Sequence, residues 1–287
     1  MVGIPESVAI VGAGQAGSAL AHGFRRAGLR VTTITSRTTE AAAALAAAVD
    51  ADPGDLEACT GAELVCICTP DHAVAEVAGA LADLDAAQPG ACFLHTSGAL
   101  DLEVLDPLSA RGAAAGNLHP VAPLVPPEDP ATLEGKPMGF DAAGDPGWVE
   151  TLVRLLGGRP VSLVGVDRAL YHAGCVTAAN LVVGLAGAAA EMFSASGVDP
   201  ASAHELVSSL LTASARNVAT DGVAQALTGP VRRGDAATVA RHLATLEGMD
   251  SGLAETYRVV SARLVDLMEP GAARDRSARV LGGGERR

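Results

Sequence analysis

Over the first 165 residues, short apolar runs alternate with longer stretches in which apolar residues recur at helical spacing. Such an alternation predicts a mostly parallel sheet with helices on both faces. The expected strands are Ser7–Val11, Arg30–Thr35, Glu63–Thr69, Ala91–His95, Ala114–His119, Lys136–Asp141 and Pro160–Val164. The expected helices between them are Gln15–Ala27, Thr39–Val49, Asp71–Leu84, Leu102–Arg111 and Trp148–Leu156. A proline-rich stretch, Asn117–Pro137, is expected to be an irregular loop.

After Gly165 the strand signals disappear and helical periods dominate. The helices expected there are Asp167–Ser196, Pro200–Asp221, Ala236–Glu247 and Gly252–Met268. We therefore predict an α/β fold in which a Rossmann-like, mostly parallel sheet over residues 1–165 is followed by an all-α domain over residues 166–270. Residues 271–287 lack periodicity, so we expect a disordered tail.

One predicted helix contains a long uncharged segment. Ala169–Ala190 has no Asp, Glu, Lys or Arg and is long enough to span a bilayer. It also holds His172, Thr177 and Asn180, which are costly in lipid, and it has no aromatic belt. We therefore favour a buried helix between two copies of the chain, which predicts a homodimer through the helical domain and no membrane contact. A membrane span is the alternative.

The composition narrows the function further. The chain has 33 acidic and 20 basic residues, a net charge of −13 and few aromatic residues, which argues against nucleic-acid binding. The five cysteines form no CxxC pair, so we expect buried thiols in a reducing compartment and no metal site. The N-terminus does not read as a signal peptide. These features predict a cytoplasmic protein that acts on a small molecule.

The strongest motif follows the first expected strand. Its glycines occupy the three positions of G-x-G-x-x-G, directly before a helix. The first glycine permits the turn, the second lets the backbone approach a pyrophosphate, and the third lets the helix pack against the strand. The unpaired N–H groups at the helix N-terminus would bind the phosphates. The predicted cofactor-binding residues of this turn are Gly12, Ala13, Gly14, Gln15, Ala16 and Gly17.

The end of the second expected strand selects the cofactor. NAD-binding proteins usually carry Asp or Glu there, which binds the ribose 2′-hydroxyl. This chain has Ser36, Arg37 and Thr38 instead. Hydroxyl and guanidinium groups suit a 2′-phosphate, so we predict NADP(H) rather than NAD. The alternative for Arg37 is a solvated residue at a helix start.

Later strand ends supply further candidates, because the carboxyl ends of parallel strands face the ligand crevice. We expect Thr69 and Pro70 to lie beside the nicotinamide ribose. Asp71, the next residue, reads equally well as a helix N-cap. Ser97 either binds a carboxamide or substrate oxygen, or caps a turn. His119 is a candidate for the site, although a single histidine is more often structural.

Two polar residues on the long uncharged helix are also candidates. Asn180 follows His172 by eight residues, which is about 80° around a helix and about 12 Å along it. Both can therefore belong to one broad face without touching. Buried polar groups need hydrogen-bond partners. Either these two find partners within the helical domain, or they face the cleft.

The motifs occur in the order GAGQAG, SRT, CTPD, HTSGAL, NLHP and LYHAGCVTAANLVVGL. Over residues 6–268 the chain resembles Rossmann-like proteins with a C-terminal helical domain of unknown function, some of which look like an alternative class of ketopantoate reductase. The wider superfamily includes 6-phosphogluconate and 3-hydroxyisobutyrate dehydrogenases, classical ketopantoate reductases and pyrroline-5-carboxylate reductases. GAGQAG is common to all of them, whereas NLHP and YHAGCVTAAN are more specific.

The resemblance implies an NADP-dependent oxidoreductase that reduces a small 2-oxoacid, with 2-dehydropantoate to pantoate as the best single match. Reductases of imines or other oxoacids, and a non-catalytic NADP-binding regulator or scaffold, remain alternatives. The hydroxyacid dehydrogenases of the superfamily carry a catalytic Lys four residues before an Asn, but here Val176 stands four residues before Asn180. His172 or His119 is then the expected proton donor. Arg168 is the candidate to bind a substrate carboxylate.

Overall fold

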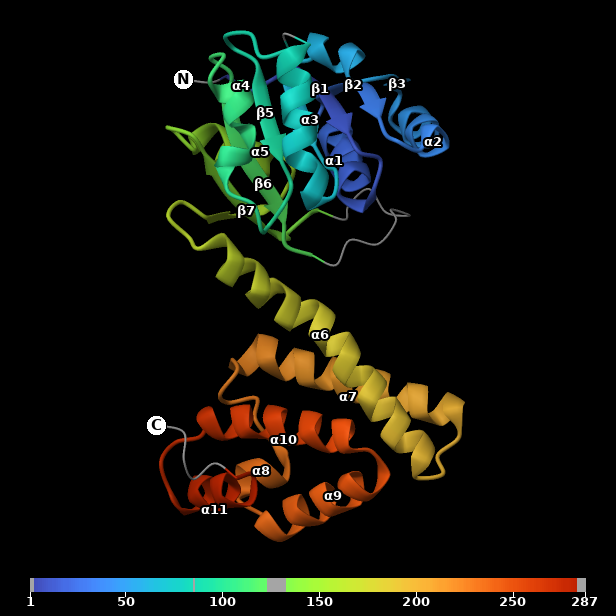
Figure 1. Cartoon of the computed structure of the whole chain (residues 1–287), viewed down its shortest axis with the longest axis vertical. Coiled ribbons are helices and arrows are strands. Elements are labelled where there is room, and N and C mark those ends of the chain that lie inside the picture. The colour runs from blue at the N-terminus through green and yellow to red at the C-terminus, as the bar shows by residue number, and fades with distance from the viewer. Residues whose placement is uncertain (1–2, 85, 123–132, 283–287) are drawn as a thin grey trace. The chain divides into compact units, whose positions relative to one another are not determined.

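The computed structural model describes residues 3–84, 86–122 and 133–282, and its strands form one eight-stranded sheet in the order β3-β2-β1-β4-β5-β6-β7-β8 (Figure 1). All neighbouring strands are parallel except β6 and β7, which are antiparallel. The predicted mostly parallel sheet is thus confirmed. The strands are β1 Ser7–Val11, β2 Arg30–Thr35, β3 Asp52–Pro53, β4 Leu64–Ile67, β5 Cys92–His95, β6 Ala114–Pro120, β7 Pro137–Ala142 and β8 Arg159–Ser162.

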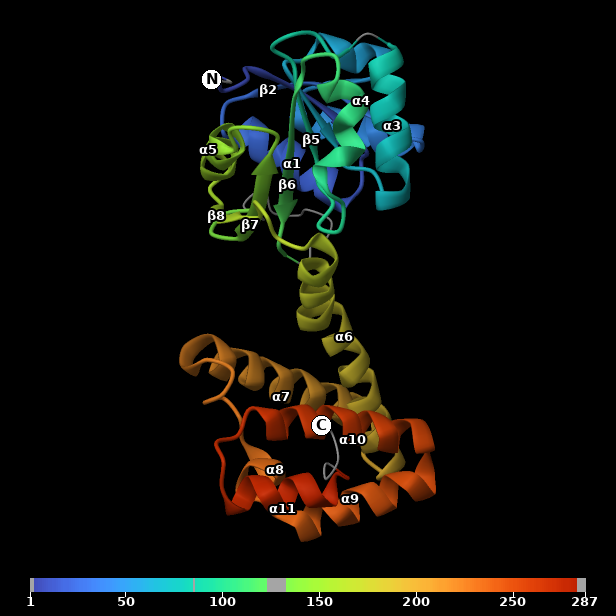
Figure 2. The same cartoon turned by 60° about the vertical axis from the view of Figure 1, so that its left-hand side comes forward.

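Helices cover both faces of this sheet, and Figure 2 shows α5 and α3 on opposite sides of it. Alternate strand residues point to opposite faces, so Val8 and Ile10 pack in one core and Ala9 and Val11 in the other. The first core includes side chains of α1, α2 and α5, and the second includes side chains of α3 and α4. The helices are α1 Gln15–Arg26, α2 Thr39–Val49, α3 Asp71–Asp83, α4 Asp106–Ser109 and α5 Gly147–Leu155, with 3₁₀ turns η1 Glu57–Gly61 and η2 Leu102–Leu105.

Three local details differ from the sequence-based expectation. The helix expected over Leu102–Arg111 is divided into η2 and α4, because Pro107 at the start of α4 has no N–H to continue a helix from η2. The short strand β3 was not expected. Within the expected loop Asn117–Pro137, β6 extends through Pro120 and β7 begins at Pro137, while residues 123–132 of that loop lie outside the described residues.

Beyond β8 the described residues are helical, as expected. The helices are α6 Arg168–Ala195, α7 Pro200–Asp221, α8 Gly229–Arg233, α9 Ala236–Met249, α10 Ser251–Asp266 and α11 Ala272–Val280. Asp199 caps α7 by accepting from the backbone N–H groups of Ala201 and Ser202, both at 3.1 Å. The chain divides into two compact units, residues 1–180 and 181–287, so that the division falls inside α6 rather than at residue 165.

The expected disorder over residues 271–287 is wrong for its first part. Residues 272–280 form α11, whose Ser277 is fully buried and donates a hydrogen bond to the carbonyl oxygen of Val231 at 2.8 Å. Leu281 packs with Val239 and Val265 in the core of the second unit. Packing of this kind stabilises a helix too short to form alone, and it leaves no periodic pattern in the sequence. Residues 283–287 lie outside the described part of the chain.

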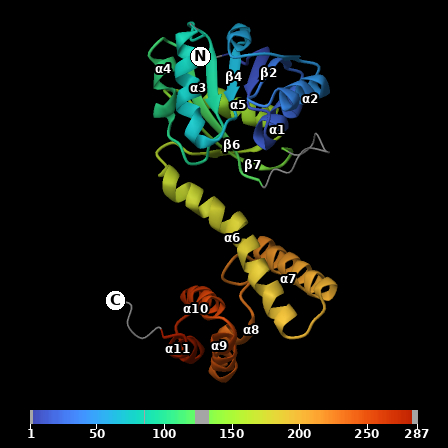
Figure 3. The ribbon, with the colours of Figure 1, turned by 45° about the vertical axis from the view of Figure 1, so that its right-hand side comes forward.

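Helix α6 is exposed in the single chain, and its predicted burial between two copies of the chain stays a prediction. Figure 3 shows it as one unbroken ribbon, and among its 28 residues only Arg168 is buried. Leu170, Leu181 and Val183 are all more than half exposed. Among the described helices it is the one long and apolar enough to cross a membrane, by length and composition only. Burial of this helix therefore needs a partner outside the described part of the chain.

Candidate active site

The glycine turn between β1 and α1 has a shape that only glycine permits at two of its positions. Gly12 has a φ of +113°, and a Cβ there would lie 2.6 Å from the carbonyl oxygen of Cys68. A Cβ on Gly17 would lie 1.9 Å from the carbonyl oxygen of Gly12. Both glycines are therefore required by the fold itself.

Gly14 differs, because a Cβ there would have no atom of the described residues within 4 Å. It is the N-cap of α1, it provides no side-chain hydrogen bond, and the first turn of the helix contains no acidic residue. The N–H groups at this helix end thus lack a side-chain cap. This is the arrangement that binds phosphate at a helix N-terminus, so the turn fits the pyrophosphate of a dinucleotide.

The end of β2 lies in the same sheet, next to β1. Ser36 is half-buried, while Arg37 and Thr38 are exposed. The Ser36 hydroxyl accepts a hydrogen bond from the backbone N–H of Thr38 at 3.3 Å. An exposed guanidinium and hydroxyls at this strand end fit the 2′-phosphate of NADP(H).

Asn117, on the interior strand β6, connects three elements from a fully buried position. Its side-chain N–H₂ donates to the carbonyl oxygens of Ser97 at 2.8 Å and His95 at 3.0 Å, and lies 3.2 Å from Nδ1 of His95. Its Oδ1 accepts from Nη1 of Arg168 at 2.9 Å. Because a guanidinium can only donate, this last contact determines which way the amide points.

Arg168, the predicted carboxylate-binding residue, is engaged within the chain. Its side chain is 2% exposed, and Nη2 lies 2.9 Å from Oδ2 of Asp141 on β7. Nη1 donates to Asn117, and Nε lies 4.0 Å from Oδ1 of the exposed Asp101. A buried cation requires such partners. In the described chain Arg168 therefore fastens the start of α6 to β6 and β7.

His119 pairs with Tyr171, which is the fourth residue of α6. Nδ1 of His119 lies 2.8 Å from the hydroxyl of Tyr171, and the two rings meet edge-on with centroids 5.6 Å apart. Burial lowers the pKa of His119 to about 4, with the charges of His172 and Arg168 acting in the same direction and Asp71 opposing them. Burial also raises the pKa of Tyr171 well above its usual value. The pair is therefore neutral at neutral pH.

Two buried polar atoms near these strand ends have no hydrogen-bond partner among the described residues. They are Oγ1 of Thr69 and Nε2 of His95. Nδ1 of His95 faces the Asn117 N–H₂ and must accept, which puts the ring proton on Nε2, and burial lowers the pKa of this histidine to about 3. A buried donor without a partner is costly. These two atoms, at the carboxyl ends of the adjacent strands β4 and β5, therefore fit a ligand that brings its own hydrogen-bonding groups, as a dinucleotide does.

The structure brings some predicted site residues together and leaves others apart. Thr69, Ser97 and His119 all lie at the carboxyl ends of β4, β5 and β6. The Ser97 hydroxyl accepts from the backbone N–H groups of Ala99 and Leu100, so it caps a turn in the described chain. Pro70 is the N-cap of α3 and Asp71 its first residue, so Asp71 is not the cap.

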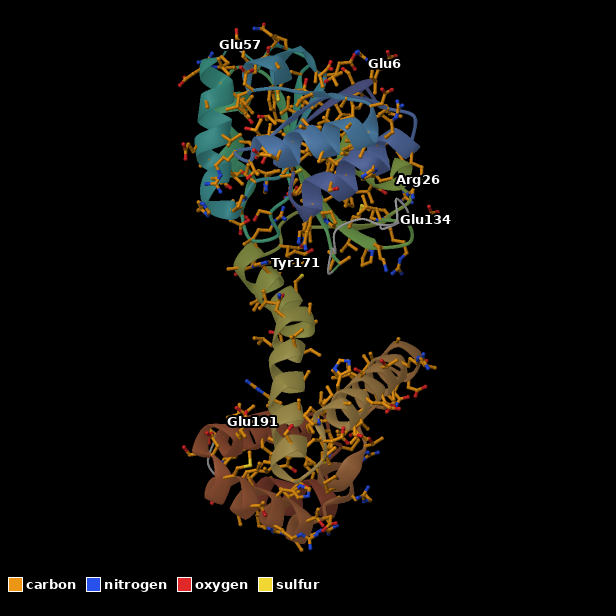
Figure 4. All side chains as sticks on the ribbon, turned by 90° about the vertical axis from the view of Figure 1, so that its right-hand side faces the viewer. Glu6, Arg26, Glu57, Glu134, Tyr171 and Glu191 are labelled. Atoms are coloured by element: carbon orange, nitrogen blue, oxygen red, sulfur yellow. The ribbon has the colours of Figure 1, made fainter. Side chains whose placement is uncertain are left out.

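On α6, His172 is half-buried and close enough to His119 for their charges to interact. Asn180 is exposed, about two turns further along. Sequence reasoning missed His95, Asn117 and Tyr171 as site residues. Each lies within a motif and directly before or close to a residue that we had singled out, and Tyr171 is labelled near the start of α6 in Figure 4. Its position next to His172 was the available signal.

Family models match the N-terminal and the C-terminal part of the chain separately. The description "Rossmann-like domain" matches residues 4–120, and "Domain of unknown function (DUF2520)" matches residues 137–264. The chain thus has a Rossmann-like N-terminal domain followed by a DUF2520 domain, which confirms the predicted combination. No protein with a curated description matches the sequence.

Solved structures share the fold over nearly the whole chain. A proposed NADP oxidoreductase from Bacteroides fragilis is 22% identical, with 90% of this chain and 97% of that chain covered and a TM-score of 0.74. A reductive aminase from Aspergillus terreus, in complex with NADPH and ethyl levulinate, is 19% identical, with 94% and 98% covered and a TM-score of 0.64. A pyrroline-5-carboxylate reductase from Coxiella burnetii is 13% identical, with 93% and 100% covered and a TM-score of 0.61. The chain therefore has the fold of NADP(H)-dependent oxidoreductases.

Proposed function

We propose that this chain is an NADPH-dependent reductase of a small 2-oxoacid, with 2-dehydropantoate as the leading substrate. The cofactor part of the proposal is carried by an uncapped glycine turn, which lies on the same side of the sheet as two buried polar atoms without a hydrogen-bond partner among the described residues. The 2-oxoacid substrate is what the family resemblance implies. The open side of Gly14 would hold the pyrophosphate, and Arg37 the 2′-phosphate. Thr69, Pro70 and Ser97 would lie along the nicotinamide half.

When bound, NADPH supplies the hydride that reduces the carbonyl carbon. The residues of this chain then have to bind the substrate and deliver a proton to its oxygen. Arg168 contacts Asn117 and Asp141, so His172 is the basic side chain beside His119 that remains for a substrate carboxylate. Asn180 stays a proposed substrate-binding residue further along α6.

The test is a pair of measurements on the purified full-length chain. Calorimetric titration compares NADPH with NADH, and absorbance of the reduced nicotinamide follows turnover with a panel of 2-oxoacids, with and without added amines. We expect tighter binding of NADPH and turnover without an amine. Turnover only with an amine would indicate an imine reductase. Binding without any turnover would indicate the non-catalytic alternative, and no binding would remove the dinucleotide site.

We also propose that the exposed faces of α6 and α7 bind a second copy of the chain. Helix α7 has 22 residues, of which only Ala203 is buried. On the two helices the large apolar side chains Leu181, Val183, Leu206, Leu210 and Val218 are exposed. Exposed apolar surface of this kind marks an interaction site. The Ala169–Ala190 segment carries no charged side chain, so it has no charges that would select a partner of opposite charge. The same uncharged surface on a second copy of the chain can pack against it.

Sedimentation velocity of the chain without detergent tests whether two copies associate. We expect a dimer, and we expect Leu181→Glu to weaken it. Val164→Glu is a matched control, because Leu181 and Val164 are both 56% exposed and Val164 lies in the first unit. A monomer at micromolar concentration would contradict the proposal, and capture by lipid vesicles instead would favour the membrane alternative.

A further inference from the structure

The His119–Tyr171 pair holds one more proton than its hydrogen bond uses. A neutral imidazole carries one ring N–H and a phenol carries one O–H. One of these two protons lies between Nδ1 and the Tyr171 hydroxyl, which are 2.8 Å apart. The other points out of the pair. We propose that the His119–Tyr171 pair donates this outer proton to the substrate oxygen, an inference that rests on the proposed reductase function.

The fold makes room for the pair with two glycines. A Cβ on Gly98, in the turn after β5, would come within 2.7 Å of the His119 ring. A Cβ on Gly139, on β7, would lie 3.0 Å from the Tyr171 hydroxyl and 2.5 Å from Leu163. A larger residue at either position would therefore clash with the pair.

The start of α6 is held in place for the same contact. Arg168 lies three residues before Tyr171 and is fixed to Asn117 on β6 and Asp141 on β7. His119 is two residues after Asn117 on the same strand. The ion pair and the amide therefore position Tyr171 over His119 from both elements. In this arrangement Arg168 and Asn117 are positioning residues, while the pair meets the substrate.

The surroundings keep the pair neutral. The titratable or charged groups that act on it are Asp71 of α3, His95 of β5, and Arg168, His172 and Cys175 of α6. Only Asp71 favours a charged His119, and burial outweighs it. An imidazolium is thus absent at neutral pH, and the donated proton comes from a neutral N–H or O–H. This favours the pair over a lone histidine, because the hydrogen bond spreads the negative charge that remains after transfer.

The step balances with the reductant of the proposed function. The hydride forms the new C–H bond, and the electron pair of the carbonyl C=O moves onto oxygen. That oxygen forms an O–H bond with the outer proton, whose bond to the pair breaks. The pair is left with one negative charge and regains a proton from water.

The kinetic test compares four variants: Tyr171→Phe, His119→Asn, the double variant, and His172→Asn, which probes the proposed carboxylate contact rather than the proton transfer. Tyr171→Phe keeps the ring that packs on His119 and removes only the hydroxyl. We expect each pair variant to lower kcat by about 10²–10⁴-fold with little change in KM or in NADPH affinity. The double variant should be no worse than the worse single variant, because the two residues act as a unit. His172→Asn should raise KM and largely preserve kcat. Normal kcat in Tyr171→Phe would overturn the proposal.

A second readout does not depend on turnover. The ¹⁵N signals of the His119 ring are followed while oxamate, a 2-oxoacid analogue, is added to the NADP⁺-loaded protein. We expect a shift in the wild type that is lost in Tyr171→Phe. If the wild type binds the cofactor but reduces no carbonyl compound, the proposed reductase function is refuted, and this outcome is distinct from a failure of the pair. A His119 ring that does not respond to oxamate would refute the pair as the group facing the substrate.

Discussion

Asp141→Asn should strongly destabilise the first unit, because it leaves a buried cation without its counter-charge. The side chains of Arg168 and Asp141 are 2% and 15% exposed, and Nη2 lies 2.9 Å from Oδ2. The substitution changes the charge and little else. Oδ1 of Asp141 accepts from the backbone N–H of Ala142 at 2.8 Å, and an asparagine oxygen can keep that bond.

Two physical arguments give the same magnitude. Two unit charges about 4 Å apart attract by about 4 kcal/mol at an effective dielectric constant near 20. Removing one partner of a buried ion pair typically costs about 3–5 kcal/mol, since the remaining charge stays out of water. The exposed Asp101 is 4.0 Å from Nε of Arg168 and cannot replace the lost contact. We therefore expect the free energy of unfolding to fall by about 3–5 kcal/mol.

The chain contains a built-in reporter for this measurement. Trp148 is its single tryptophan and is buried in the core of the first unit. Its fluorescence during urea unfolding therefore follows that unit and not the helical one. Glu150→Gln is the control, because it breaks the exposed pair of Glu150 and Arg154 and should cost about 0.3–0.5 kcal/mol.

A double variant, Asp141→Asn with Arg168→Met, separates charge from packing. It removes both charges and should regain part of the loss, limited by Oδ1 of Asn117, which loses its donor. If the free energy of unfolding of Asp141→Asn lies within about 1 kcal/mol of the wild-type value, the buried-charge argument is refuted. The anchoring of α6 through Arg168 would then have to be abandoned.

Three further predictions follow from the same geometry. Gly14→Val should abolish NADPH binding and leave the stability unchanged, whereas Gly17→Val should unfold the first unit, because of the two positions only Gly14 has room for a Cβ. Unfolding followed by Trp148 fluorescence measures both variants, and equal effects on stability would contradict this. Arg37→Asp should weaken NADPH binding by about 1.5–3 kcal/mol and NADH binding much less, measured by calorimetry, and an equal loss for both would exclude Arg37 as the discriminator. His95 and His119 have folded pKa values of about 3 and about 4, below the unfolded value of about 6.5, so the unfolded chain takes up protons first as the pH falls. The free energy of unfolding should therefore fall by about 2 kcal/mol per histidine between pH 7 and pH 5, and a flat profile over that range would show that these histidines are not buried.

The sequence by itself determined the features that depend on neighbouring residues. The alternation of apolar runs predicted the strands from β1 to β8 apart from the two-residue β3. The spacing of Gly12, Gly14 and Gly17 predicted a turn, and the structure shows which of these glycines the fold requires and which it leaves open. The helical period from Pro200 predicted the start of α7. In each case the cause is local backbone geometry, which a short stretch of sequence specifies.

The tertiary structure alone decided what the polar residues contact. His119 and Tyr171 are 52 positions apart and Arg168 and Asn117 are 51 apart, so no periodicity could pair them. Arg168 looked free to bind a substrate carboxylate until the fold brought Asp141 against it. The order of α11 likewise depends on distant partners, because Ser277 bonds to Val231 across 46 positions. A side chain's type states what it can bind, but its partner is set by which strands and helices the folded chain places beside it.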